Sequence, residues 1–178
     1  MNMVEAINFS EYAFVSIGSN LPSSVGDSLQ TIIFAMKKLE KLASSPLLKS
    51  SIYSTSPVNS PPGTPDFLNA LVGLLPGAHE SPQTLLQKLQ AIEKQAGRNR
   101  SGIKNEARTL DLDLILYKKE SISDPELVLP HPRLQERKFV MQPLVEIVGR
   151  EFKFPESEGT AGGILDSIQD QKSEKLQS

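Results

Sequence analysis

Two aspartates in the segment RTLDLDLILY (108–117) are the strongest chemical signal in the sequence. The alternation of apolar and polar residues predicts a β-strand over 110–117, with Asp111 and Asp113 on one face and about 7 Å between their Cα atoms. Two carboxylates this close repel each other unless a cation or water lies between them, so the pair fits a hard divalent cation such as Mg²⁺. An acidic solvent face on an edge strand is the alternative. The opposite face would carry the leucines Leu110, Leu112, Leu114 and Leu116.

A basic cluster precedes this strand and contains Arg98, Arg100, Lys104 and Arg108. Guanidinium groups bind phosphate oxygens through paired hydrogen bonds, and together with a carboxylate pair they suit Mg²⁺-nucleotide chemistry. The chain has neither a G-x-x-x-x-G-K-S/T nor a G-x-G-x-x-G motif, so side chains rather than a glycine-rich loop would hold the phosphates. A solvated basic loop is the alternative for this cluster.

The composition excludes several kinds of site. The 178 residues include no Cys, no Trp and only two His, which excludes thiol nucleophiles, Fe–S clusters and cysteine-based zinc sites. The 19 Lys and Arg nearly balance the 21 Asp and Glu, so nucleic acid is not an expected partner. His131 lies between Pro130 and Pro132, six residues before Arg137, and we expect it to contact phosphate, although a structural histidine is the commoner case.

Two aromatic residues lie next to polar groups in the sequence. Phe67 is two residues before Asn69, and Phe139 is two residues after Arg137. Two rings can hold a flat heteroaromatic ligand between them, and the Asn69 amide can read the edge of such a ligand by hydrogen bonds. Packing in the core is the alternative role for both rings.

The elements that would position these residues follow from hydrophobic periodicity. Strands are expected at 12–17, 47–53, 67–75 and 110–117, with helices at 27–42 and 81–96. The order β-α-β-β-α-β predicts an α+β fold of the ferredoxin-like kind, in which helices pack on an antiparallel sheet and extra C-terminal elements follow. A turn is expected at 18–20, a proline-rich loop at 54–66 and a short helix at 139–148. We expect an N-terminal extension (1–11), one catalytic domain (12–155) and a polar tail or weak helix (156–178).

The sequence contains no apolar run near the length of about 20 residues that a membrane-spanning helix needs. Its first twelve residues lack the basic region of a secretory signal. We therefore expect a soluble, cytoplasmic protein without a membrane partner.

Six collinear stretches over residues 12–150 form a recognisable set. They are FVSIGSNL (14–21), YSTSPV (53–58), PDFLNALV (65–72), IEKQAGRNR (92–100), ARTLDLDLILY (107–117) and LPHPRLQERKFVMQPLVEI (129–147). Together they resemble the 6-hydroxymethyl-7,8-dihydropterin pyrophosphokinase family of the folate pathway.

The resemblance implies transfer of pyrophosphate from ATP to the hydroxymethyl group of the dihydropterin, with release of AMP. It implies two Mg²⁺ ions bound by Asp111 and Asp113, which would act in catalysis together with Arg98, Arg100 and Arg108. The residues implied at the ATP site are Gln90, Glu93, Arg98, Arg100, Arg108, Leu114, His131 and Arg137. Those implied at the pterin site are Thr55, Ser56, Pro57, Val58, Phe67, Asn69 and Phe139.

The resemblance also implies that the loops 54–66 and 98–107 act as mobile lids over the substrates. Lys104, Asn105 and Glu106 stand where many members have Arg, Trp and Gly, so closure of the second lid is expected to differ. For the proton of the acceptor hydroxyl two alternatives stay open: Asp111 takes it, or a metal lowers the pKa of the hydroxyl. The natural chain could be linked to other folate-pathway enzymes.

Two other classes of function remain open from the residues alone. A non-catalytic ferredoxin-like module that binds RNA would need a basic sheet face, whereas Asp111 and Asp113 repel phosphate without a metal. A divalent-metal phosphohydrolase would use the same aspartates, and the sequence does not separate hydrolysis from transfer.

Overall fold

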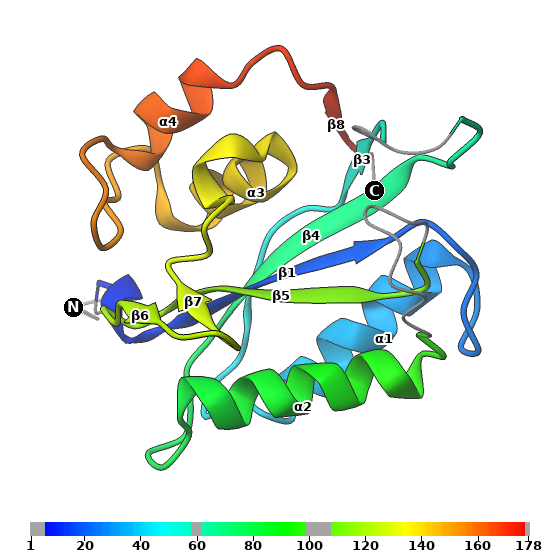
Figure 1. Ribbon diagram of the computed structural model, residues 1–178, viewed down its shortest axis with the longest axis horizontal. Helices are drawn as coiled ribbons and strands as arrows, with labels where there is room; N and C mark the ends of the chain where they lie inside the picture. The colour runs from blue at the N-terminus through cyan, green and yellow to red at the C-terminus, as the bar shows by residue number, and fades with distance from the viewer. Residues whose placement is uncertain (1–5, 58–61, 99–107, 177–178) are drawn as a thin grey trace, which may run out of the picture.

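A computed structural model describes residues 6–57, 62–98 and 108–176, and its centre is an antiparallel sheet with helices on both faces (Figure 1). The strand order is β5-β1-β4-β3-β8, and β2 also pairs with β4. This arrangement confirms the predicted α+β, ferredoxin-like fold. The strands are β1 (Ala13–Ser19), β2 (Leu48–Lys49), β3 (Tyr53–Thr55), β4 (Phe67–Leu74), β5 (Asp111–Tyr117) and β8 (Ser173–Lys175).

Helices α1 (Ser28–Glu40) and α2 (Pro82–Gln95) cover one face of the sheet, as the apolar periodicity predicts (Figure 1). Each begins with a capping box. In this motif the side chain of the N-cap residue accepts the backbone N–H three residues later, and the side chain of that later residue accepts the N-cap backbone N–H. Asp27 and Gln30 form the first box, and Ser81 and Thr84 form the second. The buried side chains between these helices and the sheet include Val15, Ile17, Ile32, Leu39, Leu85, Leu89, Leu112 and Leu114.

The other face of the sheet is covered by α3 (Lys138–Val148), and α4 (Ala161–Ser167) packs against α3. The weak helix expected after residue 156 corresponds to α4, whose Leu165 is buried in a second core with Phe14, Leu71 and Leu144. Further along, β8 pairs with β3 and extends the sheet. No helix among the described residues is long and apolar enough to cross a membrane. The remaining elements are η1 (Phe9–Glu11), β6 (Ile122–Ser123), β7 (Val128–Leu129) and η2 (Leu134–Glu136).

Three local predictions are wrong. The turn expected at 18–20 begins later, because β1 continues through Ser19 in register with β4. The single strand expected at 47–53 is two strands, β2 and β3. Leu116 does not share the face of Leu114, because a β-bulge leaves Ile115 without a partner on β1, and Ile115 and Leu116 both join the α3 core.

The burial of α4 makes a testable prediction. Leu165 is 8% exposed. Leu165→Ala should lower the free energy of unfolding by about 2–3 kcal/mol, because it removes apolar contacts and leaves a cavity in the core. Ile33 on α1 is 42% exposed, and Ile33→Ala should cost less than about 1 kcal/mol. Urea unfolding measures both, and equal losses would contradict the packing of α4.

Candidate functional site

A pocket opens on the α3 side of the sheet, where β1, β3, β4 and β5 meet the start of α3. Its position follows from strand alternation: Leu112 and Leu114 face α1 and α2, so Asp111 and Asp113 point to the opposite side. One part of the wall is charged and consists of Arg108, Asp111, Asp113, Arg133 and Arg137. The other part carries rings and hydrogen-bonding groups, namely Thr55, Ser56, Pro57, Phe67, Asn69 and Phe139.

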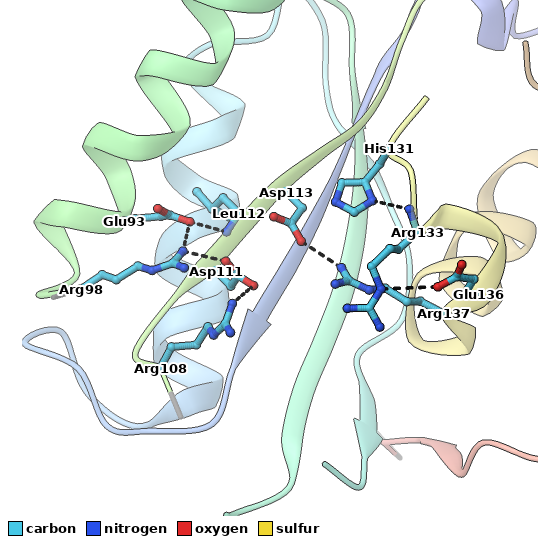
Figure 2. A network of polar contacts seen from close by, with 10 residues as sticks. All are labelled: Glu93, Arg98, Arg108, Asp111, Leu112, Asp113, His131, Arg133, Glu136 and Arg137. Atoms are coloured by element: carbon cyan, nitrogen blue, oxygen red, sulfur yellow. Dashed lines mark hydrogen bonds and ion pairs between the residues drawn. The ribbon is translucent and has the colours of Figure 1, made fainter. Parts of the chain in front are cut away.

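Asp111 lies between two arginines (Figure 2). Its Oδ1 accepts from Nη1 of Arg98 and its Oδ2 from Nη1 of Arg108, both at 2.6 Å. Arg98 also pairs with Glu93, a buried residue of α2 whose Oε1 accepts the Leu112 backbone N–H at 2.8 Å. Burial alone would lower the pKa of Arg98, but the charges of Asp111 and Glu93 outweigh burial and raise it. The two carboxylates therefore stabilise the charged form of Arg98 at the start of β5.

Asp113 is less well compensated than Asp111. Its Oδ2 lies 3.3 Å from Nη1 of Arg137 (Figure 2). Burial and the charge of Asp111 raise the pKa of Asp113 to about 6, although Arg137 opposes the shift. A nearby cation stabilises the charged form of a carboxylate whose charge is disfavoured in this way.

His131 is held by the irregularity in β5. Its backbone N–H donates to the carbonyl of the bulge residue Ile115 at 2.9 Å. Its Nδ1 accepts the Arg133 backbone N–H at 3.1 Å, which leaves the proton of the neutral ring on Nε2 (Figure 2). Burial and the charges of Arg137 and Arg133 lower the pKa of His131 to about 4. The imidazole is therefore neutral at physiological pH and can donate a hydrogen bond through Nε2.

The ring-bearing part of the wall is built from β3, β4 and α3. Asn69 is buried, and its Nδ2 donates to Oγ1 of Thr55 at 2.7 Å, which orients the amide. Phe67 is paired with Thr55 in the sheet. Phe139 lines the pocket from α3, with the Arg137 guanidinium carbon 5.5 Å from its ring centre. Cation–π attraction thus joins the charged part of the wall to the aromatic part.

The floor of the pocket contains two residues that the sequence analysis did not identify, Ser16 and Gly18 of β1. They pair with Asp113 and Asp111 across the sheet. A Cβ on Gly18 would lie 3.2 Å from Oδ1 of Asn69, so glycine allows the close approach of this amide. The alternation with Val15 and Ile17 is the signal that could have placed both residues on the pocket face.

Asn20 connects the two sides of the site. Its Nδ2 donates to the Pro65 carbonyl at 3.1 Å, while its Oδ1 accepts the Arg108 backbone N–H at 2.8 Å. Pro65 precedes β4, and Arg108 precedes β5. The buried amide therefore fixes the starts of the segments that carry the aromatic and the charged residues.

The donor set fits a magnesium ion that is shared with a phosphate ligand. Asp111 and Asp113 offer carboxylate oxygens on one face of β5, where burial and the charge of Asp111 raise the pKa of Asp113. No group of three or more candidate metal ligands occurs among the described residues. Mg²⁺ is commonly held by one or two carboxylates, with substrate phosphates and water completing its shell.

The other predicted site residues are placed as follows. Glu93 and Arg98 adjoin the charged part of the wall through Asp111. Gln90 is exposed on α2. The Leu114 side chain is buried towards α1 and α2, so it does not face the pocket. Val58, Arg100, Lys104, Asn105 and Glu106 lie outside the described residues, as do parts of both predicted lids.

Comparison with known proteins identifies the family of the chain. The sequence profile of the 7,8-dihydro-6-hydroxymethylpterin-pyrophosphokinase (HPPK) family matches residues 14–149. The chain is 36% identical over 135 residues to the 2-amino-4-hydroxy-6-hydroxymethyldihydropteridine pyrophosphokinase of Haemophilus influenzae, which covers 76% of this chain and 80% of that protein. It is 34% identical over 148 residues to a folate synthesis bifunctional protein of Arabidopsis thaliana.

The Arabidopsis match covers 83% of this chain but only 29% of the bifunctional protein, so this chain corresponds to one part of it. A solved structure of HPPK-DHPS in complex with substrates has the same fold, with a TM-score of 0.67 at 14% identity. That similarity covers 89% of this chain and 43% of the other.

The fold and the family profile together define an α+β enzyme of the pyrophosphokinase class. The chain belongs to the HPPK family, whose reaction is pyrophosphoryl transfer in folate synthesis.

The environment of His131 predicts its titration. The imidazole should titrate near pH 4 in the folded protein, below its ordinary value of about 6.5. Since the unfolded chain takes up the proton first, His131 should make the protein less stable as pH falls from about 6.5 to about 4. NMR of the ring nitrogens measures both the midpoint and the Nε2–H tautomer. Arg137→Gln should raise the midpoint, and a wild-type midpoint near 6.5 would contradict this electrostatic account.

Proposed function

We propose that this chain catalyses the Mg²⁺-dependent transfer of pyrophosphate from ATP to the hydroxymethyl group of 6-hydroxymethyl-7,8-dihydropterin, releasing AMP. The observation that carries the proposal is the composition of a single pocket. Asp111, Asp113 and Arg108 line one part of its wall, while Phe67 and Phe139 line another. A polyphosphate and a flat ring can therefore meet there.

On the phosphate side, the arginines would release their carboxylate partners and bind the phosphates of ATP. Arg98 and Arg108 both bond to Asp111, so incoming phosphates would compete with Asp111 for these guanidinium groups. Arg137 would neutralise charge from the opposite side of Asp113. Neutral His131 would donate its Nε2–H to a phosphate oxygen, and Arg100, Gln90 and Glu93 are the further residues proposed around the nucleotide. The buried side chain of Leu114 faces away from the pocket and is not included.

Asp111 and Asp113 are the proposed ligands of two Mg²⁺ ions. When bound, magnesium would offset the negative charge of the phosphates and help to align the donor with the acceptor hydroxyl. The protein's own contribution is positioning, because its side chains would hold the hydroxyl in line with the β-phosphorus and limit the access of water.

On the acceptor side, the pterin would stack between Phe67 and Phe139. The amide of Asn69, already oriented by Thr55, would read the ring edge, together with the backbone of Thr55, Ser56, Pro57 and Val58. Arg137 contacts Phe139 and Asp113, so one side chain would connect the stacked ring to the phosphate site.

We further propose that the protein works in the cytoplasm, near other enzymes of the folate pathway. The bifunctional Arabidopsis relative supports the proximity to other folate-pathway enzymes, because it joins a region similar to this chain to further sequence.

The direct test is incubation with ATP, Mg²⁺ and 6-hydroxymethyl-7,8-dihydropterin, with nucleotides separated by chromatography. AMP should form only when the pterin is present. Release of ADP or free phosphate would instead favour a kinase or a phosphohydrolase.

Asp113→Ala should lower turnover by at least about 1,000-fold, because a metal-binding carboxylate is lost. The melting temperature should change little, because burial and Asp111 already disfavour the charge on Asp113. Asp166→Ala breaks an exposed ion pair with Arg150 away from the pocket and should leave turnover unchanged. An Asp113→Ala enzyme with more than a tenth of wild-type turnover would refute the metal assignment.

Arg108→Ala should slow the single-turnover rate by about 100-fold, because the transferred group loses a charged hydrogen-bond donor. Pterin affinity should change less than about 3-fold, since Arg108 lies on the phosphate side. Rapid quenching gives the rate, and Arg150→Ala serves as the matched surface control. An unchanged single-turnover rate in Arg108→Ala would remove Arg108 from the phosphate site.

A further inference from the structure

Glu146 of α3 collects hydrogen bonds from two other elements outside the pocket. Its Oε2 accepts the Ser51 backbone N–H at 3.0 Å and the Tyr53 hydroxyl at 2.8 Å. Its Oε1 accepts the Ser51 hydroxyl at 2.6 Å and Nζ of Lys175 at 3.2 Å. The carboxylate therefore joins α3 to the start of β3 and to the C-terminal strand β8.

The protonation states suit this set of hydrogen bonds. Burial alone would raise the pKa of Glu146, but the hydrogen bonds from Ser51, Tyr53 and Lys175 outweigh it and lower that pKa. Burial and the bond to Glu146 raise the pKa of Tyr53. At neutral pH the tyrosine therefore donates and the carboxylate accepts, and hydrogen bonds to a charged group are stronger than those between neutral groups.

The bonded residues on β3 lie next to the ring-bearing part of the pocket wall. Tyr53 pairs with Asn69 across the sheet, and Thr55, two residues after Tyr53, pairs with Phe67. The strand then continues into Ser56 and Pro57, which line the pocket. A shift of β3 along or away from α3 would therefore move this part of the wall.

On α3, Glu146 is seven residues after Phe139. Seven residues make almost two helical turns, so both side chains project from nearly the same side of α3, about 10 Å apart along its axis. Fixing Glu146 against β3 therefore also fixes the rotation of α3 that directs Phe139 into the pocket.

We propose that Glu146 is a positioning residue. It sets the separation between Phe139 on α3 and the β3–β4 side of the pocket, between which the pterin would stack. The inference rests on the proposed function, since it assigns Glu146 to the acceptor half of that site. Lys175 contributes little, because its side chain is 59% exposed and such surface pairs are weak.

The sheet order makes the effect selective. The residues proposed for ATP and metal are mainly on β5 and α2, and β1 and β4 separate β5 from β3. Arg137, directly before α3, is the exception among them, so loosening the α3–β3 contact should weaken pterin binding much more than ATP binding. A general loss of stability would affect both ligands.

The test measures the affinities of the intact chain for two probes. Fluorescence titration follows 6-hydroxymethylpterin, and calorimetry with Mg²⁺ follows the non-hydrolysable α,β-methylene analogue of ATP. Glu146→Ala should raise the Kd for the pterin about 10-fold or more, while the Kd for the ATP analogue changes less than about 3-fold, and KM for the pterin should rise more than kcat falls. Glu146→Gln, which keeps the shape and one acceptor oxygen, should restore part of the pterin affinity.

Glu40→Ala is the matched control, because Glu40 forms an exposed ion pair with Lys49 at the end of α1. It should leave both affinities unchanged. If Glu146→Ala does not fold, Tyr53→Phe removes one hydroxyl from the same cluster and should raise the Kd for the pterin about 3-fold or more.

A folded Glu146→Ala protein with unchanged pterin affinity would overturn the positioning role, and so would an equal loss of affinity for both probes. If Tyr53→Phe has to be used, an unchanged pterin affinity overturns the role in the same way. Failure of the wild-type chain to bind the pterin would overturn the proposed function itself, which keeps the two failures distinguishable.

Discussion

The balance of charge on one face of β5 is the constraint on which the site depends. Asp111 and Asp113 point to the same side of β5, an edge strand of the sheet, where burial disfavours the charge of Asp113 and Asp111 adds repulsion. Arg98 and Arg108 neutralise Asp111, and Arg137 partly compensates Asp113. The near-neutral net charge of the chain conceals this local concentration of opposite charges.

The fold brings a second, less charged surface to this strand. β1 lies between β5 and β4, and its Ser16 and Gly18 form a narrow floor between the carboxylates and Asn69. Asn20 links the backbone before β4 to the backbone before β5, and Glu146 links α3 to β3. Polar side chains that take no part in the reaction thus fix the positions of the two halves of the pocket relative to each other.

Much of this organisation could be predicted from the sequence. Apolar spacing identified α1, α2, β4 and β5, because their patterns have clear periods and their ends carry capping or turn residues. Strand alternation also placed Asp111 and Asp113 on one face. The bulge at Ile115 could not be predicted, because an extra residue in a strand depends on pairing with β1 and leaves no mark in a run of apolar residues. The Glu146 cluster was missed because its hydroxyl donors are 93 and 95 residues away along the chain.

The central claim is that the pocket transfers a pyrophosphoryl group rather than hydrolysing ATP. ATP labelled separately at the β- and γ-phosphorus tests it most directly when supplied with Mg²⁺ and 6-hydroxymethyl-7,8-dihydropterin. Both labels should appear in the pterin product, leaving unlabelled AMP. Retention of the β-label in ADP, or release of either label as free phosphate before it reaches the pterin, would contradict the account.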